Sequence, residues 1–112
     1  MVDDAASPFA EEAVVEYLRA STLSPGDAEI QSGLAEAALA CRLAVVAQRA
    51  AERAAELGDS VARRILLARA KALAGDVAGA LATLDAAENE PKLAGDADRG
   101  SVATWRERLR AK

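Results

Sequence analysis

The fold is decided by residues 61–91, whose sequence is VARRILLARAKALAGDVAGALATLDAAENEP. This stretch predicts two short helices joined by a tight turn at Gly75-Asp76. Apolar residues recur at spacings of three, four and seven on both sides of the turn, which places one apolar stripe on each helix. A short connection makes the helices antiparallel, and we expect Ala80 to be packed between them. Because the hairpin cannot bury both stripes alone, further helices are predicted before and after it.

The composition favours helices throughout the chain. Alanine accounts for 30 of the 112 residues, and only three residues are aromatic. Alanine has the highest helix propensity, and no alternating run of β-branched and aromatic residues predicts a strand. The sequence therefore predicts one all-α domain over residues 1–112, built of stacked antiparallel helical hairpins, with residues 1–6 disordered. A plain helical bundle is the alternative arrangement.

The stretch before this hairpin, residues 28–57, allows two interpretations. It contains neither a proline nor a Gly-Asp turn, which favours one long helix. When the sequence is laid on itself with Leu39 on Leu73, however, Cys41-Arg42 falls on Gly75-Asp76. That match, at an offset of 34, favours an earlier copy of the hairpin whose turn has lost its glycine. The residues alone leave both interpretations open.

The offset and the hairpin resemble the tetratricopeptide repeat. The matching features are a leucine followed by a small residue, the turn, two small positions and a closing proline, found here at Leu67-Ala68, Gly75-Asp76, Ala80, Ala87 and Pro91. The stretch is also similar to the degenerate arrays of large bacterial regulators. Arg64 and Lys71 depart from the family pattern, because that family prefers large apolar or aromatic residues at these positions.

The resemblance implies a short tetratricopeptide-like array that acts as a small non-enzymatic adaptor for a peptide or a partner helix. Arrays of this family line a groove with residues of each first helix. The groove residues expected here are Gln31, Ala35, Ile65, Arg69, Leu73, Arg99 and Arg106. An acidic ligand suits such a row, because arginine pairs with carboxylates in a bidentate geometry. The alternative for Arg69 is a solvated helix residue.

Several partners and compartments are disfavoured by the sequence. The net charge of −4 argues against nucleic-acid binding. No apolar run approaches the roughly 18 residues of a membrane span, and the N-terminus lacks the features of a signal peptide. Cys41 is the only cysteine, which favours a reducing compartment. We therefore expect a cytoplasmic protein without a membrane partner.

The sequence also predicts no catalytic, cofactor or metal site. Histidine, the commonest general base and metal ligand, is absent from the chain. No glycine-rich phosphate loop is present, and Cys41 has no histidine partner for nucleophilic chemistry. An enzyme is therefore not expected.

A structural homo-oligomer is the alternative function, with a homodimer as its simplest form. Residues 1–29 hold seven acids and one arginine, a net charge of −6, which leaves +2 on residues 30–112. This asymmetry favours a second copy docked head to tail, in a contact that salt would weaken. Trp105 is expected either under the preceding hairpin, near Leu81 and Leu84, or exposed as an anchor for another molecule.

Overall fold

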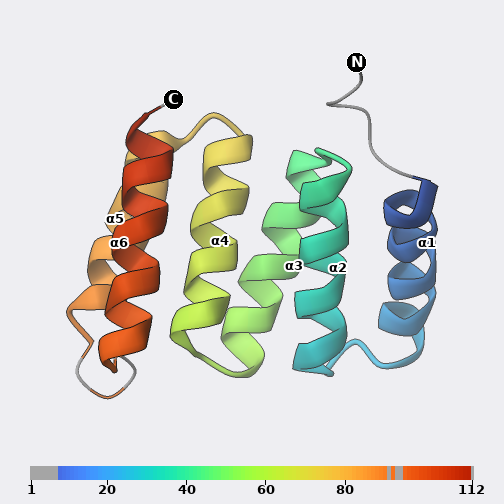
Figure 1. Ribbon diagram of the computed structural model, residues 1–112. Helices are drawn as coiled ribbons and strands as arrows, with labels where there is room; N and C mark the ends of the chain where they lie inside the picture. Colours follow the sequence, from blue (N-terminus) through green and yellow to red (C-terminus); the bar gives the residue numbers. More distant parts are fainter. Residues whose placement is uncertain (1–7, 91, 93–94, 112) are drawn as a thin grey trace.

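The computed structural model describes residues 8–90, 92 and 95–111, and these residues form helices and connecting turns without a strand. The helices are α1 (Pro8–Leu23), α2 (Ala28–Ala40), α3 (Ala44–Leu57), α4 (Val61–Leu73), α5 (Val77–Glu88) and α6 (Asp96–Arg110) (Figure 1). None of these described helices is both long and apolar enough to cross a membrane. The segment 1–6, expected to be disordered, lies outside the described residues.

The helices form the predicted array of antiparallel hairpins. α2 pairs with α3 and α4 pairs with α5, while α1 packs on α2 at one end and α6 packs on α5 at the other. Figure 1 shows α2 in front of α3 and α6 in front of α5, with α4 between them. α2 contacts α4, and α4 contacts α6, so these three helices share one side of the molecule, here called the even-helix face.

Residues 28–57 form two helices, so the interpretation as one long helix is wrong. The turn between them places Arg42 at a φ of 58°, in the left-handed region that Gly75 occupies at 97° in the second hairpin. A non-glycine residue in this region costs on the order of 1 kcal/mol. The earlier copy of the hairpin therefore exists, with an arginine at the position of the turn glycine.

The two hairpins repeat at an offset of 33, so the predicted offset of 34 is out of register by a single position. α2 and α4 begin at Ala28 and Val61, and α3 and α5 begin at Ala44 and Val77, so both differences are 33. Completely buried residues coincide at this offset, in the pairs Ala35 and Ala68, Ala47 and Ala80, Ala51 and Leu84, and Ala54 and Ala87. Because alanine is so frequent, both offsets lay apolar residues on apolar residues, and the sequence does not distinguish them.

The helix starts are capped by short polar side chains where the sequence supplies them. The Asp27 carboxylate accepts hydrogen bonds from the backbone N–H groups of Glu29 and Ile30. Ser60 and Asp76 cap α4 and α5 in the same way. Leu43 occupies the equivalent position before α3 and makes no such bond. A missing N-cap costs about 1 kcal/mol, so the first hairpin turn is less well specified than the second.

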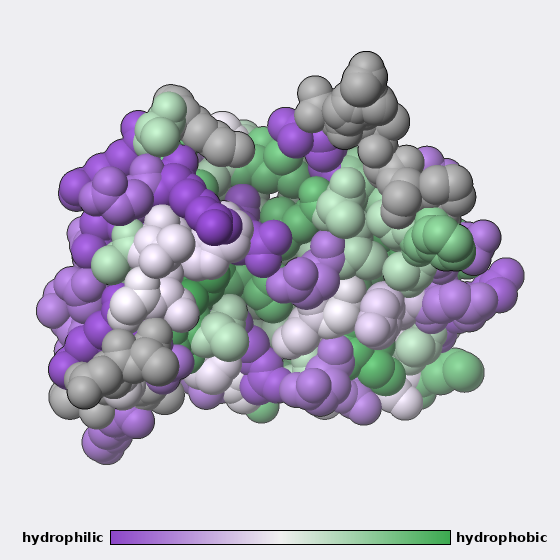
Figure 2. Space-filling view, in the orientation of Figure 1, coloured by the Kyte–Doolittle hydropathy of each residue, from purple (hydrophilic) through white to green (hydrophobic). Residues whose placement is uncertain are grey.

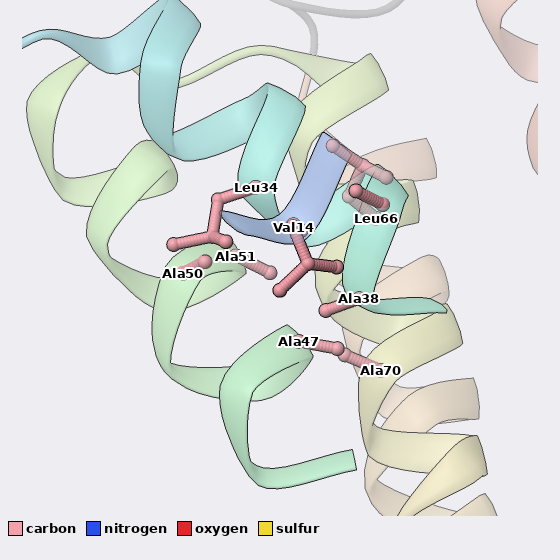
Figure 3. Close-up of a cluster of buried hydrophobic side chains, with 10 residues drawn as sticks. Val14, Leu34, Ala38, Ala47, Ala50, Ala51, Leu66 and Ala70 are labelled. Atoms are coloured by element: carbon pink, nitrogen blue, oxygen red, sulfur yellow. The ribbon is translucent and has the colours of Figure 1, made fainter. Parts of the chain in front are cut away.

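The core consists of two clusters that meet at α4. The first cluster joins α1, α2, α3 and α4 through small and medium apolar side chains (Figure 3), among them Val14, Leu34, Ala38, Ala47, Leu66 and Ala70. The second joins α4, α5 and α6 through Val61, Ile65, Ala68, Ala80, Leu84, Ala87, Val102 and Leu109. Ala80 is completely buried, as predicted. α4 therefore connects the two halves of the array.

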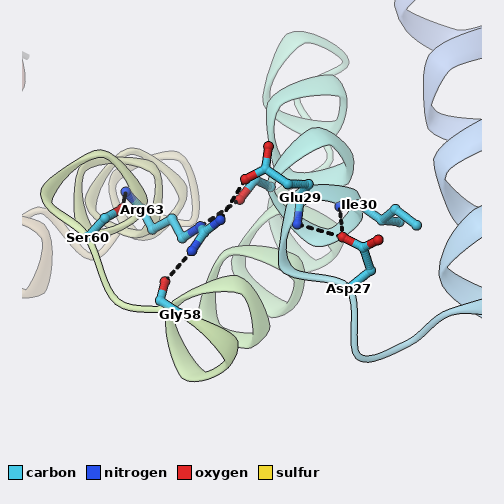
Figure 4. Close-up of polar contacts among 7 residues, drawn as sticks. Asp27, Glu29, Ile30, Gly58, Ser60 and Arg63 are labelled. Atoms are coloured by element: carbon cyan, nitrogen blue, oxygen red, sulfur yellow. Dashed lines mark hydrogen bonds and ion pairs between the residues drawn. The ribbon is translucent and has the colours of Figure 1, made fainter.

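One arginine adds a polar link between the hairpins (Figure 4). The Arg63 side chain donates to Glu29 Oε1 at 2.7 Å, to the Gly58 carbonyl at 2.6 Å and to Ser32 Oγ at 3.2 Å. These partners lie on α2 and at the end of α3, whereas Arg63 lies on α4. The side chain is only 20% exposed, so its hydrogen bonds are partly shielded from water.

Replacing Arg63 with methionine is expected to lower the free energy of unfolding by about 1–3 kcal/mol, because the Gly58 carbonyl loses its charged donor. The measurement is chemical denaturation followed by circular dichroism. Arg53→Met is the matched control, since Arg53 is 48% exposed and, among the described residues, pairs with Glu56 alone, at 3.5 Å within the same helix. Such surface pairs contribute about 0.5 kcal/mol or less. Equal effects of the two substitutions would contradict a role for Arg63 between the hairpins.

Candidate functional site

A hollow on the even-helix face combines an apolar floor with arginine side chains. Its volume is about 330 Å³, and residues of three helices and one turn line it: Leu39, Arg42, Arg69, Ala72, Leu73, Trp105 and Leu109. Figure 2 shows hydrophobic surface set back between more polar flanks on this side of the molecule. Because α2, α4 and α6 run in the same direction, the C-terminal parts of all three helices meet here.

Trp105 lies between the core and this hollow. Part of the ring packs against the second core cluster, and the half-buried side chain also lines the hollow. The expected packing near Leu81 and Leu84 is therefore confirmed for part of the ring, and a role as an anchor for another molecule stays a prediction. The guanidinium carbons of Arg69 and Arg108 lie 4.5 and 4.8 Å from the centre of the ring. Cations at these distances are attracted to the electron-rich face of an indole.

Arg69 is held in place from two directions. Trp105 supports its guanidinium group, and Nη1 lies 3.2 Å from Glu36 Oε1 on α2. The side chain remains 27% exposed, so it is accessible to a ligand. Arg42 is exposed in the α2–α3 turn, where its backbone is left-handed, and its side chain lines the hollow. The arrangement presents guanidinium N–H groups to a carboxylate or another anion beside an apolar floor.

Of the residues predicted for the groove, the structure places Arg69 and Leu73 together in this hollow. Gln31 is buried, and its amide donates to Ser21 Oγ at 2.9 Å. Ala35 has no exposed surface, and Ile65 is 8% exposed within the second core cluster. These three side chains are covered by the chain itself.

The two remaining predicted residues lie outside the hollow. Arg99 is exposed in the first turn of α6. Arg106 pairs with Asp85 at 2.8 Å and with Glu88 at 3.2 Å, both on α5. The hydrogen bond to Glu88, and then that to Asp85, raise the pKa of the Arg106 guanidinium above its usual range. Arg106 thus links α5 to α6 as a charged group.

Residues that the prediction left out complete the hollow. They are Leu39, Arg42, Ala72, Trp105 and Leu109, with Arg108 against the ring. Arg42 carried a sequence signal, because it follows Cys41 in the segment that aligns with the glycine turn of the second hairpin. Trp105 was expected either under the preceding hairpin or exposed as an anchor, and neither expectation placed it among the groove residues. No local pattern in the sequence predicts that residues of α2 and α6 line the same hollow, because the two helices are far apart along the chain and, among the described residues, do not contact each other.

A second hollow lies on the opposite side, where α3 faces α5. Its volume is about 440 Å³, and its polar lining includes Glu52, Glu56, Asp59 and Arg64. Arg64 Nη2 lies 2.6 Å from Asp59 Oδ2, and this hydrogen bond lowers the pKa of the Asp59 carboxyl. The arginine is thus already paired within the chain. Among the described residues, no group of three acids or thiols is arranged to hold a metal ion.

Comparison with protein-family models, curated proteins and solved structures finds no match to this chain.

Proposed function

We propose that this chain is a non-enzymatic protein-interaction module of tetratricopeptide-like architecture that binds an acidic peptide segment on its even-helix face. The observation that carries the proposal is the set of guanidinium groups around the hollow, with Arg69 and Arg108 against Trp105 and Arg42 at the edge. The peptide's carboxylates pair with these arginines, and its apolar side chains lie on Leu39 and Leu73.

The fixed position of Arg69 favours binding. A long side chain that is ordered before association loses less conformational entropy when the ligand arrives. Trp105 and Glu36 supply that order in the free protein. The volume of about 330 Å³ holds a few side chains of an extended segment rather than a folded domain.

The local charges, taken together, also favour an anionic ligand. The C-terminal ends of α2, α4 and α6 contribute roughly half a negative charge each, and these lie at the same end of the array as the hollow. Glu36 adds one further negative charge. Arg42 and Arg69 line the hollow and Arg108 lies against the Trp105 ring, so the three side chains supply three positive charges. The arginines are also the groups nearest to a ligand, so they dominate its interaction with the site.

The architecture supports the family part of the proposal. Antiparallel hairpins repeat along the chain, and the first helix of each lies on a shared face, as the resemblance implies. Arg64 and Lys71, which depart from the family pattern, are paired with Asp59 and Thr83. Polar partners thus replace the large apolar residues that the family prefers there.

Replacing Arg69 with glutamine is expected to weaken binding of an acidic peptide on the order of tenfold, because a charge-assisted hydrogen bond is lost. The probe is a fluorescein-labelled peptide of alternating glutamate and leucine, followed by fluorescence polarisation. Trp105 is the only tryptophan of the chain, so its own emission reports independently on the hollow.

Arg49→Gln is the matched control, since Arg49 is an exposed arginine of α3 that does not line the hollow. A second control is a peptide with glutamine in place of glutamate, which should bind more weakly to the unmodified protein. Equal binding of the two peptides, or equal effects of the two substitutions, would overturn the proposal.

A further inference from the structure

α1 carries most of the large apolar side chains that are exposed in the described part of the chain. They are Phe9, Val15, Tyr17, Leu18 and Leu23, with exposed fractions from 36% to 85%. The two others, Leu43 and Val45, lie at the start of α3. Of the five, Val15 and Leu18 are three residues apart and share one face of the helix, whereas Phe9 and Leu23 point in other directions and the Tyr17 ring lies against Gly33 of α2. Two large exposed apolar side chains on one face leave that face open to a partner.

The position of α1 explains why this surface is open. Among the described helices, α1 contacts α2 and no other. Val14 points into the first core cluster and is 7% exposed. Val15 follows Val14 by one residue, which is a rotation of about 100° around the helix, and Leu18 lies on the same face as Val15. A hollow on this outer side is lined by Glu11, Glu12, Val15, Glu16 and Arg19.

We propose that the outer face of α1 docks a second copy of the chain, with the two α1 helices antiparallel about a two-fold axis. A contact that buries large apolar side chains on both sides needs such a face on each copy. α6, at the other end of the array, has no large apolar side chain that is exposed among those described. The outer face of α1 in one copy is therefore best matched by the same face in a second copy. A contact between two identical surfaces is two-fold symmetric.

The charges of α1 fit the antiparallel direction. Arg19 is the only basic residue between Pro8 and Leu23, and Glu11 and Glu12 lie near the opposite end of the helix. When the helices run antiparallel, Arg19 of each copy lies at the height of the acidic turn of the other. A parallel pair would instead place the glutamates of the two copies side by side, where like charges repel.

The effect of salt on dimer stability distinguishes this contact from the head-to-tail alternative. α1 holds Glu11, Glu12, Glu16 and Arg19, a net charge of −2, so the pair of helices carries −4. Salt screens this residual repulsion, and the symmetric dimer should persist or strengthen as salt is added. Docking of acidic α1 onto basic α6 is an attraction, which salt would weaken. The contact is also separate from the hollow beside Trp105, to which α1 contributes no lining residue.

The first test is sedimentation velocity over a range of protein and salt concentrations. We expect a monomer–dimer equilibrium that does not weaken with salt. Val15→Glu should weaken it on the order of tenfold or more, because the new carboxylate would be buried without a partner. Val45→Glu is the matched control, since Val45 is 66% exposed outside α1, and it should leave the dimer unchanged.

The second test detects the geometry without destabilising the contact. In a Cys41→Ala background, Val15→Cys should give a disulfide-linked dimer under mild oxidation, whereas Val45→Cys should give none. A monomer at every concentration, a dimer that salt dissociates, or equal effects of the two glutamate substitutions would overturn the proposal. Circular dichroism of Val15→Glu establishes that the variant is folded, and an unfolded variant leaves the cross-linking result to decide.

Discussion

Replacing Leu84 with alanine is expected to lower the free energy of unfolding by about 2–5 kcal/mol, because it opens a cavity in the second core cluster. Leu84 lies on α5 and is completely buried, and among the described residues it is one of the two largest side chains with no exposed surface. It packs in the same cluster as Ile65 of α4 and Val102 of α6. The loss is a large share of the stability of a domain of this size.

The measurement is chemical denaturation with circular dichroism, and Leu23→Ala provides the matched control. Leu23 is 85% exposed, so the same truncation there removes almost no buried surface. Its effect should stay within about 0.5 kcal/mol. If the two substitutions lowered stability equally, Leu84 would not be at the centre of the second cluster, and the packing of α5 between α4 and α6 would be wrong.

The same position shows how the two hairpins differ. Ala51 is the counterpart of Leu84 in the first hairpin, and it is also completely buried. The first hairpin therefore has a smaller side chain at this point of its interior. Val14 of α1 and Leu34 of α2 supply bulk to the first cluster instead. α1 is thus part of the core of the array, although it belongs to neither hairpin.

Helix class and hairpin pairing followed from local features of the sequence. Apolar spacing, alanine content and the turn at Gly75 act over a few residues, so they can be read without knowledge of the rest of the chain. α4 ends at Leu73 and α5 begins at Val77, on either side of the predicted turn. The turn at Arg42 was not decided by the sequence, because its residues lack the usual glycine.

The one-residue difference between the predicted and the observed repeat offset decided which of the predicted groove residues are accessible. At the observed offset of 33, the counterpart of Arg69 is Glu36, which is exposed and pairs with it at 3.2 Å. The offset of 34 put Ala35 in that place, and Ala35 is completely buried. One residue along a helix is a rotation of about 100°, so this small error replaced a surface residue with a core residue.

The hollow itself depends on tertiary contacts that no local pattern records. Ile65 lies one helical turn before Arg69, on the side of α4 that carries the predicted groove, but it is buried in the second core cluster with residues of α5 and α6. Arg69 remains accessible because it lies farther along α4, beside Trp105. Which residues of a helix are covered is set by its neighbours, and the whole of α5 separates α6 from α4 along the chain.

Replacing Trp105 with alanine is the second large expected loss, about 2–4 kcal/mol of unfolding free energy. The range lies somewhat below that of a fully buried tryptophan, because the side chain is only half-buried. The loss combines the packing of the ring on the second cluster with its contacts to Arg69 and Arg108. Trp105→Phe is the matched control: it keeps an aromatic face for the arginines and should lose about half as much or less. The stability of both variants is measured by circular dichroism, because replacing Trp105, the only tryptophan, removes the tryptophan fluorescence signal.

The emission of the unmodified protein then tests Trp105 against the proposed dimer. Two copies joined through α1 leave the surroundings of Trp105 unchanged, because the ring contacts residues of α4 and α6. We therefore expect its emission maximum to stay constant on dilution and on addition of salt, even while the dimer dissociates on dilution. A shift to the red on dilution would mean that a second copy covers Trp105. Such a shift would place the contact on α6 and overturn the α1 pairing. In the stability experiment, an unchanged free energy of unfolding for Trp105→Ala would show that Val102 and Leu109 close the core without the ring.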